Sequence, residues 1–193
     1  MSIAPMHKQP IIKTNVIKLK TLVHYICDRA PNPRRLGATK LNKILFFSDM
    51  EAYLTLGQPI AGEVYIKHQY GPVSKHLEEI LEELEGDQAI AIAHASGFHV
   101  VTGEPFTQQL FVALYRPQLD DFSAEEISIV DEMIRVICMR HTARSISDFS
   151  HNIIWESAEI GEEIPYYTAF VHTLGEITPE DVDWAKGEIT RRG

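Results

Sequence analysis

Residues 40–49 read Lys-Leu-Asn-Lys-Ile-Leu-Phe-Phe-Ser-Asp, and this segment decides the fold. Its middle is apolar nearly all round, a pattern typical of a helix that is buried on every side. We expect the helix to run from about residue 39 to residue 56, because Gly57 is a natural left-handed residue just after a helix end. The sequence therefore predicts one central, buried helix.

Asp49 stands at the end of this apolar segment. If its side chain is buried it needs a polar partner, and Tyr53, His68 and Tyr70 are candidates. The alternative is that Asp49 faces solvent at the edge of the buried segment. The sequence leaves both interpretations open.

Regular patterns on both sides of the central segment predict further helices and strands. Asn15 is a good N-cap, and Ser123 begins a capping box. Further helices are expected over residues 15–29, 123–140, 145–159 and 178–192. Strands are expected over residues 63–69, over a hairpin of residues 89–94 and 98–102 that turns at 95–97, and over residues 106–115, which also suit a short helix.

Residues 70–72 read Tyr-Gly-Pro and are interpreted as a turn that opens another helix. Gly71 lets the backbone turn, and Pro72 suits the first position of a helix. An apolar stripe then follows at helical spacing, formed by Val73, Leu77, Ile80, Leu81 and Leu84. The opposite face is acidic, as is typical of a solvated surface, and consists of Glu78, Glu79, Glu82, Glu83 and Glu85.

Together these elements predict an α+β fold dominated by helix, with about six helices around a small, mostly antiparallel β-sheet. A chain of 193 residues is long enough to bury one sizeable hydrophobic core. We expect a flexible N-terminal tail over residues 1–14, one domain over residues 15–175, and a C-terminal helix over residues 176–193 that extends the same domain.

Charge is distributed unevenly along the chain, whose formal net charge is −9. Residues 1–45 contain nine Lys or Arg and one acid, whereas residues 46–193 contain nine Lys or Arg and 26 acids. An acidic body repels nucleic acid and attracts a basic partner. The basic first quarter suits phosphate contacts through Arg34, Arg35, Lys40 and Lys43. A solvated surface with uneven signs is the simpler interpretation.

No pattern of residues predicts a metal site, a cofactor or a catalytic centre. None of the nine histidines has the spacing of metal ligands. Asp148, Ser150 and His151 lie within four residues on one expected helix, where adjacent side chains point apart, so they do not form a hydrolytic triad. We expect a protein that is not an enzyme. The alternative is an active site assembled from Asp49, His68 and Tyr70.

The two cysteines, Cys27 and Cys138, lie more than a hundred residues apart among apolar neighbours. This is typical of free thiols in a reducing compartment. No stretch approaches the roughly 18 apolar residues that a membrane span requires. We therefore expect a soluble, cytoplasmic protein with no membrane partner.

Four ordered pieces of the sequence carry a resemblance to a known family: residues 40–49, Gly57-Gln58-Pro59-Ile60, Tyr70-Gly71-Pro72-Val73, and Ser150-His151 with Trp155 and residues 161–166. In this order and spacing they resemble the Panacea domain of SocA-like antitoxins, which is also found in phage-associated proteins. Ile44, Phe46 and Phe47 replace the family's more usual leucine and tyrosine. The expected helix from Thr178 lies outside the resemblance.

The resemblance implies a non-enzymatic antitoxin that neutralises a cognate protein toxin by direct binding. For some similar proteins it also implies delivery of the toxin to a Clp-type protease. The shared positions are Lys40, Leu41, Asp49, Gly57, Pro59, Tyr70, Gly71, Pro72, Ser150, His151 and Trp155, of which most are interpreted as making the fold. Asp49, Tyr70 and the nearby His68 are either residues that make the fold or a cluster that faces the partner.

Our leading hypothesis is therefore an antitoxin that acts by protein–protein contact. Glu78, Glu79, Glu82 and Glu83 would then occupy a positively charged groove of the toxin as a charge mimic. The alternative is a nucleic-acid-associated regulator that uses the basic first quarter. A homo-oligomer is compatible with either.

Overall fold

The computed structural model describes residues 12–98, 102–150 and 159–169, and over these residues the fold is α+β and dominated by helix, as predicted. The described strands form two small antiparallel sheets rather than one. In chain order the elements are α1 (Val16–Arg29), α2 (Pro33–Leu56), β1 (Tyr65–His68), β2 (Gly71–Ser74), α3 (Leu77–Gly86), β3 (Ile90–Phe98), β4 (Pro105–Ala113), α4 (Ala124–Arg140), α5 (Ala143–Ser150) and the 3₁₀ turn η1 (Tyr166–Thr168).

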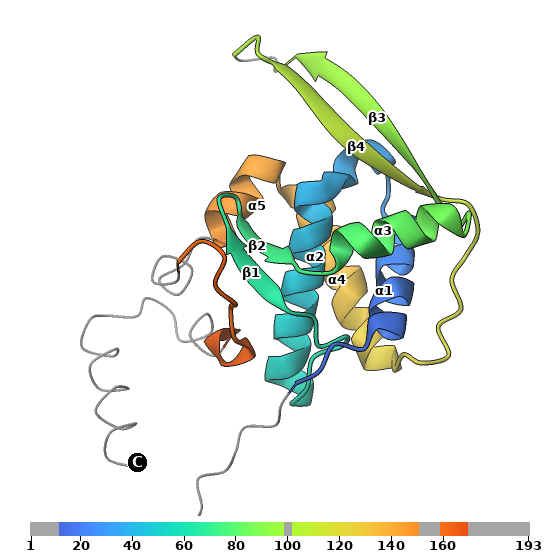
Figure 1. Cartoon of the computed structure of the whole chain (residues 1–193), viewed down its shortest axis with the longest axis vertical. Helices are drawn as coiled ribbons and strands as arrows, with labels where there is room; N and C mark the ends of the chain where they lie inside the picture. Colours follow the sequence, from blue (N-terminus) through green and yellow to red (C-terminus); the bar gives the residue numbers. More distant parts are fainter. Residues whose placement is uncertain (1–11, 99–101, 151–158, 170–193) are drawn as a thin grey trace, which may run out of the picture.

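Helix α2 is the centre of the molecule, as its apolar sequence predicts (Figure 1). It contacts α1, α4, α5 and the strands β2 and β4. Gly57 ends it in the left-handed conformation with φ 78°, which confirms the expected helix end. The expected start near residue 39 is also borne out for the long helical segment: Asn32 caps a short first turn at Pro33, the chain leaves helical geometry at Gly37, and the continuous helix follows Gly37.

Helices α1 and α4 flank α2. Both begin at the N-cap residues that the sequence predicts. The Asn15 side chain accepts a hydrogen bond from the backbone N–H of Lys18 at 3.0 Å. The Ser123 capping box is formed in both directions with Glu126. The Lys18 ammonium lies 2.7 Å from the buried Glu126 carboxylate, so the two helices are tied at their first turns.

Strands β1 and β2 form a hairpin that corrects the prediction for the Tyr-Gly-Pro segment. Gly71 pairs with His68 and Pro72 pairs with Lys67, so both lie in β2 rather than at the start of a helix. Helix α3 begins only at Leu77, after His76. Pro72 is tolerated here because β2 is an edge strand, where no ladder partner needs its missing N–H.

The other edge of β1 is covered by residues 161–164, which come from much later in the chain. The N–H of Lys67 donates to the carbonyl of Glu162 at 2.8 Å, and the N–H of Ile164 donates to the carbonyl of Tyr65 at 2.8 Å. An isolated bridge joins Ile66 to Glu163. Backbone hydrogen bonds thus fix the late segment against the middle of the fold.

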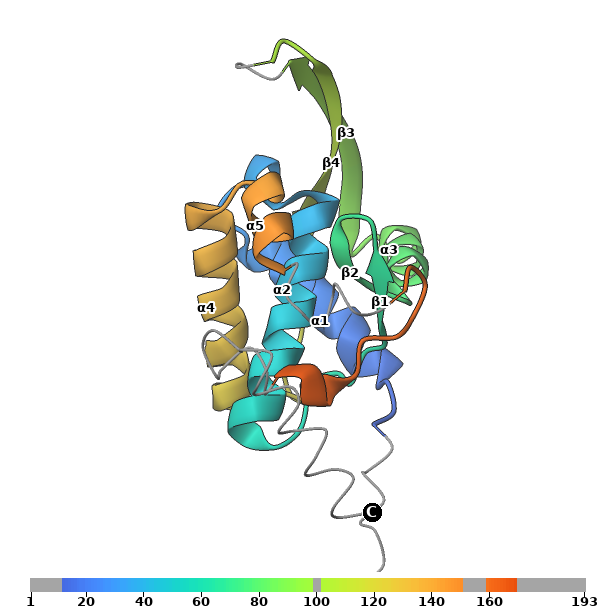
Figure 2. The ribbon, with the colours of Figure 1, turned by 90° about the vertical axis from the view of Figure 1, so that its left-hand side faces the viewer.

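Strands β3 and β4 form the second hairpin, which projects from the helical body as an arm (Figures 1 and 2). We call these two strands the β3–β4 arm. The predicted turn at residues 95–97 is wrong, because β3 continues through them and pairs with β4 up to Phe98 opposite Pro105. Ile90 and Phe111 bury the base of the arm in the core, whereas Phe98 near the tip is 73% exposed.

Several expectations fall outside the described residues. They are the N-terminal tail over residues 1–11, the fold-making roles of His151 and Trp155, the continuation of α5 to residue 159, and the C-terminal helix over residues 176–193. The start of α5 is a correction: Thr142 rather than Ser145 caps it, since its hydroxyl accepts from the N–H of Ser145 at 3.0 Å. No described helix is both long and apolar enough to cross a membrane.

Candidate functional site

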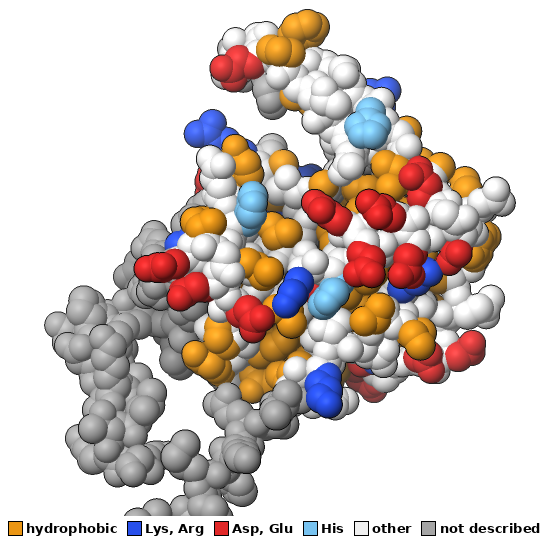
Figure 3. All heavy atoms as spheres, viewed as in Figure 1, with side chains coloured by type: hydrophobic (Ala, Val, Ile, Leu, Met, Phe, Trp, Pro, Cys, Tyr) orange, Lys and Arg blue, Asp and Glu red, His pale blue; other side chains and the backbone are white. Residues whose placement is uncertain are grey.

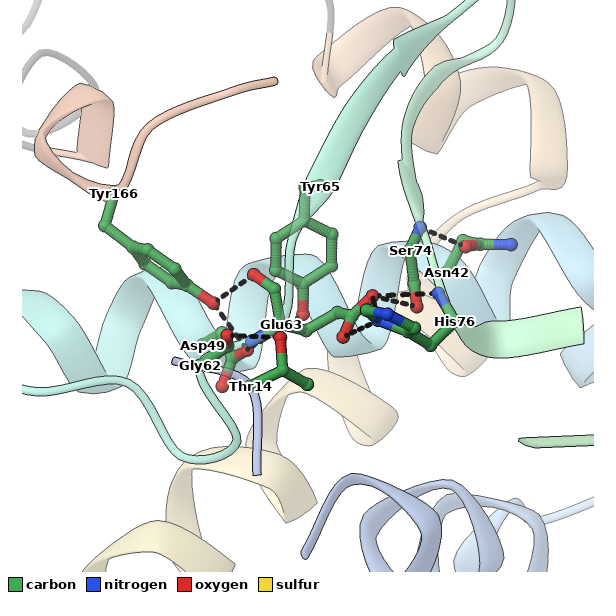
Figure 4. Close-up of polar contacts among 9 residues, drawn as sticks. All are labelled: Thr14, Asn42, Asp49, Gly62, Glu63, Tyr65, Ser74, His76 and Tyr166. Atoms are coloured by element: carbon green, nitrogen blue, oxygen red, sulfur yellow. Dashed lines mark hydrogen bonds and ion pairs between the residues drawn. The ribbon is translucent and has the colours of Figure 1, made fainter. Parts of the chain in front are cut away.

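Asp49 lies fully buried at the centre of a polar cluster (Figure 4). Its Oδ1 accepts from the N–H of Ala61 at 2.9 Å, and its Oδ2 accepts from the N–H of Glu63 at 3.2 Å. The hydroxyls of Tyr65 and Tyr166 donate to the same Oδ2 at 3.0 and 2.8 Å. Burial raises the pKa of Asp49, and these four hydrogen bonds act in the opposite direction.

The two tyrosines make this cluster a junction between distant segments. Tyr65 begins β1, while Tyr166 belongs to η1, 117 residues after Asp49. The Tyr166 hydroxyl also lies 2.7 Å from the carbonyl oxygen of Glu63. Burial, followed by the nearby Asp49 charge, raises the pKa of both phenols, so both stay protonated donors. Asp49 therefore holds β1 and η1 against α2.

The buried Glu63 side chain extends the cluster to the start of α3. Its Oε1 accepts from the Ser74 hydroxyl at 3.0 Å and from the N–H of His76 at 3.0 Å. The imidazole Nδ1 of His76 lies 3.1 and 3.0 Å from the two carboxylate oxygens. The side chain of Asn42 on α2 accepts from the N–H of Ser74 at 2.9 Å. The cluster thus positions the first turn of α3.

A second buried junction joins Lys43, Gly71 and Ser150. The Lys43 ammonium donates to the carbonyl of Pro72 at 3.0 Å, and burial lowers its pKa to about 7. Gly71 has φ +96°, and a Cβ there would lie 2.3 Å from Lys43 Nζ and 2.4 Å from Ser150 Oγ. Only glycine fits this position, because a side chain there would collide with Lys43 and Ser150.

The geometry indicates that both junctions maintain the fold. Four hydrogen-bond donors surround the Asp49 carboxylate. The described residues form two hollows, an apolar one of about 320 Å³ and another of about 360 Å³, and neither Asp49 nor Glu63 lines either of them. No group of three or more described His, Cys, Asp or Glu side chains could hold a metal ion.

The structure does not bring together the three residues of the predicted cluster. Asp49 is buried, whereas His68 and Tyr70 are exposed at the β1–β2 turn, with Tyr70 62% exposed. Asp49 therefore faces the core and not a partner, and His68 and Tyr70 are not among its hydrogen-bond donors. Of the two interpretations left open, burial is correct, but Tyr65 and Tyr166 are the partners instead of the expected side chains.

The acidic face of α3 lies on the surface as predicted. Figure 3 shows acidic side chains gathered over α3, below the β3–β4 arm. Its exposed glutamates are Glu78, Glu79, Glu82, Glu83 and Glu85. Glu83 pairs with Lys20 at 2.7 Å, and Glu85 accepts from the backbone N–H of Ile92 on β3 at 3.1 Å. The acidic face therefore reaches the base of the arm.

Most of the described basic residues in the first quarter of the chain form ion pairs within the molecule or are buried. Lys18, Lys20 and Arg29 form ion pairs with Glu126, with Glu83 and Asp87, and with Asp131. Lys40 and Lys43, which were candidates for phosphate contacts, are buried. Arg34 and Arg35 remain exposed on the first turn of α2. Part of the positive charge of the first quarter is thus neutralised within the molecule, by ion pairs between α1 and acidic residues of later elements.

Sequence reasoning missed Lys43, Glu63, Tyr65 and Tyr166 as members of the buried junctions. A lysine within an apolar helical segment was the available signal for Lys43. The other three carried none, because their partners come from other elements of the fold. Leu41, Gly57, Gly71 and Pro72 do serve the fold as expected: Leu41 is buried, Gly57 ends α2, and the other two form β2. Pro59 is half-buried in the turn after α2.

Comparison with known proteins gives one match. The family model described as antitoxin SocA-like, Panacea domain, matches residues 41–156, which is more than half of the chain. The matched range contains Lys43, Asp49, Glu63 and Gly71, and it ends before Tyr166. No curated protein and no solved structure matches the chain.

Proposed function

The chain belongs to the family of SocA-like antitoxins with a Panacea domain, and on this premise we propose that it neutralises a cognate protein toxin by binding it directly, without catalysis. Family membership supports a toxin as the partner in general. The buried positions of Asp49 and Lys43 support a structural use of the titratable groups in the core. The proposed activity therefore belongs to the surface.

The observation that carries this proposal is the exposed acidic face of α3. Glu78, Glu79 and Glu82 project from one short helix whose other side is anchored in the core by Leu77, Ile80, Leu81 and Leu84. A rigid helix of one sign attracts a basic groove, speeds association and fixes orientation. Toxins that act on RNA or nucleotides need such a groove for phosphate, so the acidic face would block it as a charge mimic.

Two finer features belong to the same proposal. The first is that the chain also delivers the bound toxin to a Clp-type protease, as the resemblance implies for some similar proteins. The cytoplasm is the proposed compartment, and the free, buried thiols of Cys27 and Cys138 support a reducing environment.

The test is growth rescue combined with co-purification. The protein encoded by the adjacent gene is expressed alone and together with this chain. We expect toxicity alone, rescue by the chain and a co-purifying complex. Toxicity with neither rescue nor binding would contradict this pairing.

A charge-reversal variant then tests the acidic face. Replacing Glu78, Glu79, Glu82 and Glu83 by lysine should abolish rescue while the melting temperature stays within a few degrees, because these side chains are exposed and the ion pair that is lost, Glu83 with Lys20, lies at the surface. The matched control replaces four exposed acids elsewhere by lysine: Asp120, Asp121, Asp148 and Glu159. Both variants change the net charge equally, so rescue that survives in the first would refute the charge mimic.

The alternative, a nucleic-acid-associated regulator, has less support from the described structure. Its basic residues are mostly paired or buried, with Arg34 and Arg35 exposed among the four candidates for phosphate contacts. Binding driven by phosphate contacts must weaken steeply as salt rises. A gel-shift titration at several salt concentrations would detect that binding, and Arg34→Ala with Arg35→Ala should then reduce it.

A further inference from the structure

The two strands of the β3–β4 arm contain no Lys, Arg, Asp or Glu, in a chain whose net charge is −9. The arm leaves the helical body after its base (Figure 2). Phe98, the last residue of β3, is 73% exposed. An isolated two-stranded ribbon is only marginally stable in water. Exposed edges are usually protected by charged side chains, proline or bulges, and β3 has none of these.

The hydrogen-bond pattern shows which backbone groups of β3 point away from β4. The N–H of Leu114 donates to the carbonyl of Ala89, and the register continues from Ile90 opposite Ala113. Ala91, Ala93, Ala95 and Gly97 are therefore the residues that bond to β4, and Ile92, His94, Ser96 and Phe98 direct their backbone groups outward. Consistently, the N–H of Ile92 donates to the Glu85 carboxylate and not to β4.

The outer edge of β3 is open beyond Ile92 over the described residues. Glu85 occupies the N–H of Ile92 at the base, and no described hydrogen bond takes the N–H of His94 or Ser96. β4 lies on the side of α2, where the Gln108 side chain donates to the carbonyl of Arg34 at 3.1 Å. The open part of the β3 edge therefore lies on the side of α3, whereas β4 lies on the side of α2.

We propose that β3 binds an extended strand of the toxin along its outer edge at His94–Phe98, and that basic residues beside that strand meet the acidic face of α3. Added strands gain main-chain hydrogen bonds from such an edge, and alternate side chains give specificity. This inference rests on the proposed function and names the surface and the partner's chemistry: an uncharged strand with a basic flank.

Charge favours this occupant over a second copy of the chain. The acidic face reaches the base of the arm, since Glu85 contacts Ile92 directly. A basic flank on the added strand would therefore be attracted as the strand pairs with β3. A second copy would bring another net charge of −9 and would be repelled at low salt.

Two proline variants distinguish binding at the outer edge of β3 from a general requirement for an intact β3–β4 arm. Ser96 and Thr107 are opposite residues in one non-hydrogen-bonded pair, so their N–H groups point to opposite edges. Ser96→Pro removes a donor from the outer edge of β3 and leaves the ladder to β4 intact. Thr107→Pro makes the same change on the β4 edge and is the matched control.

The probe is the adjacent-gene protein used in the rescue assay, and binding to the full chain is measured by titration calorimetry. We expect Ser96→Pro to weaken binding by about tenfold or more and Thr107→Pro to leave it within about threefold. Equal affinities for both variants, whether unchanged or equally lost, would overturn the β3 edge as the site. Absence of binding to the wild-type chain would contradict this pairing, as in the rescue assay, and would overturn the inference for this partner.

Sedimentation of the chain alone tests the competing occupant. We expect the wild type and Ser96→Pro to have the same oligomeric state. A wild-type dimer that Ser96→Pro converts to a monomer would overturn the inference, because a second copy would then occupy the edge. Circular dichroism of both variants verifies that the fold is kept.

Discussion

Replacing Gly71 by alanine should destabilise the fold far more than its small size suggests. The residue has φ +96°, and its new Cβ would lie 2.3 Å from Lys43 Nζ, 2.4 Å from Ser150 Oγ and 3.1 Å from Lys43 Cε. A side chain at positive φ costs about 1–2 kcal/mol. Displacing Lys43 from the carbonyl of Pro72 leaves buried polar groups unpaired, at about 1–3 kcal/mol more.

Gly57→Ala is the matched control, because it separates backbone strain from the occupied space. Gly57 also has positive φ, at +78°, but nothing lies within 4 Å of its Cβ. We expect urea unfolding to give a loss of about 1–2 kcal/mol for Gly57→Ala and about 2–5 kcal/mol for Gly71→Ala. Equal losses in the two variants would refute the argument that Lys43 and Ser150 fill the space at Gly71.

A double-mutant cycle then tests which neighbour matters. In the background of Lys43→Ala, the ammonium and the Cε that crowd Gly71 are gone, and Gly71→Ala should cost less than in the wild type. A cost that is independent of residue 43 would assign the effect to Ser150 or to the backbone alone.

Two further predictions concern the buried titratable groups. Asp49→Asn should lower the free energy of unfolding by about 2–4 kcal/mol in urea titrations, because all four described contacts are donors and an amide NH₂ cannot accept from them; an unchanged midpoint would contradict the cluster. Burial lowers the pKa of Lys43 to about 7, so between pH 7 and 9 the unfolded chain binds more protons at this residue than the folded one. Its contribution to stability should therefore rise with pH, by up to about 1.4 kcal/mol per unit, and Lys43→Met should remove that rise relative to the wild type; parallel stability curves for the two proteins would contradict the lowered pKa of Lys43.

Prediction from sequence worked best where local chemistry is decisive. The apolar segment of residues 40–49 forms the core of α2, Asn15 and Ser123 cap their helices, and Gly57 ends α2. Each of these features depends on residues within a few positions of one another. The acidic face of α3 was predictable for the same reason, since helical spacing alone puts its glutamates on one side.

It failed where a distant segment overrides a local preference. The Tyr-Gly-Pro segment at residues 70–72 suits the start of a helix. However, Lys43 donates a hydrogen bond to the carbonyl of Pro72, and pairing with β1 holds the segment as a strand. Ala-Ser-Gly at residues 95–97 suits a turn, but all three residues pair with β4. In both places, pairing with another segment of the fold holds the residues in a conformation other than the one that the local motif favours.

The sequence by itself therefore determined the central helix, the caps, the α+β class and an acidic surface, since these follow from side-chain spacing and charge. Only the tertiary structure decided what Asp49 does, because its partner Tyr166 lies 117 residues away. It also decided that Lys40 and Lys43 are buried and that β3 presents an open edge. Burial, strand register and long-range hydrogen bonds are properties of the packed chain, and no local pattern contains them.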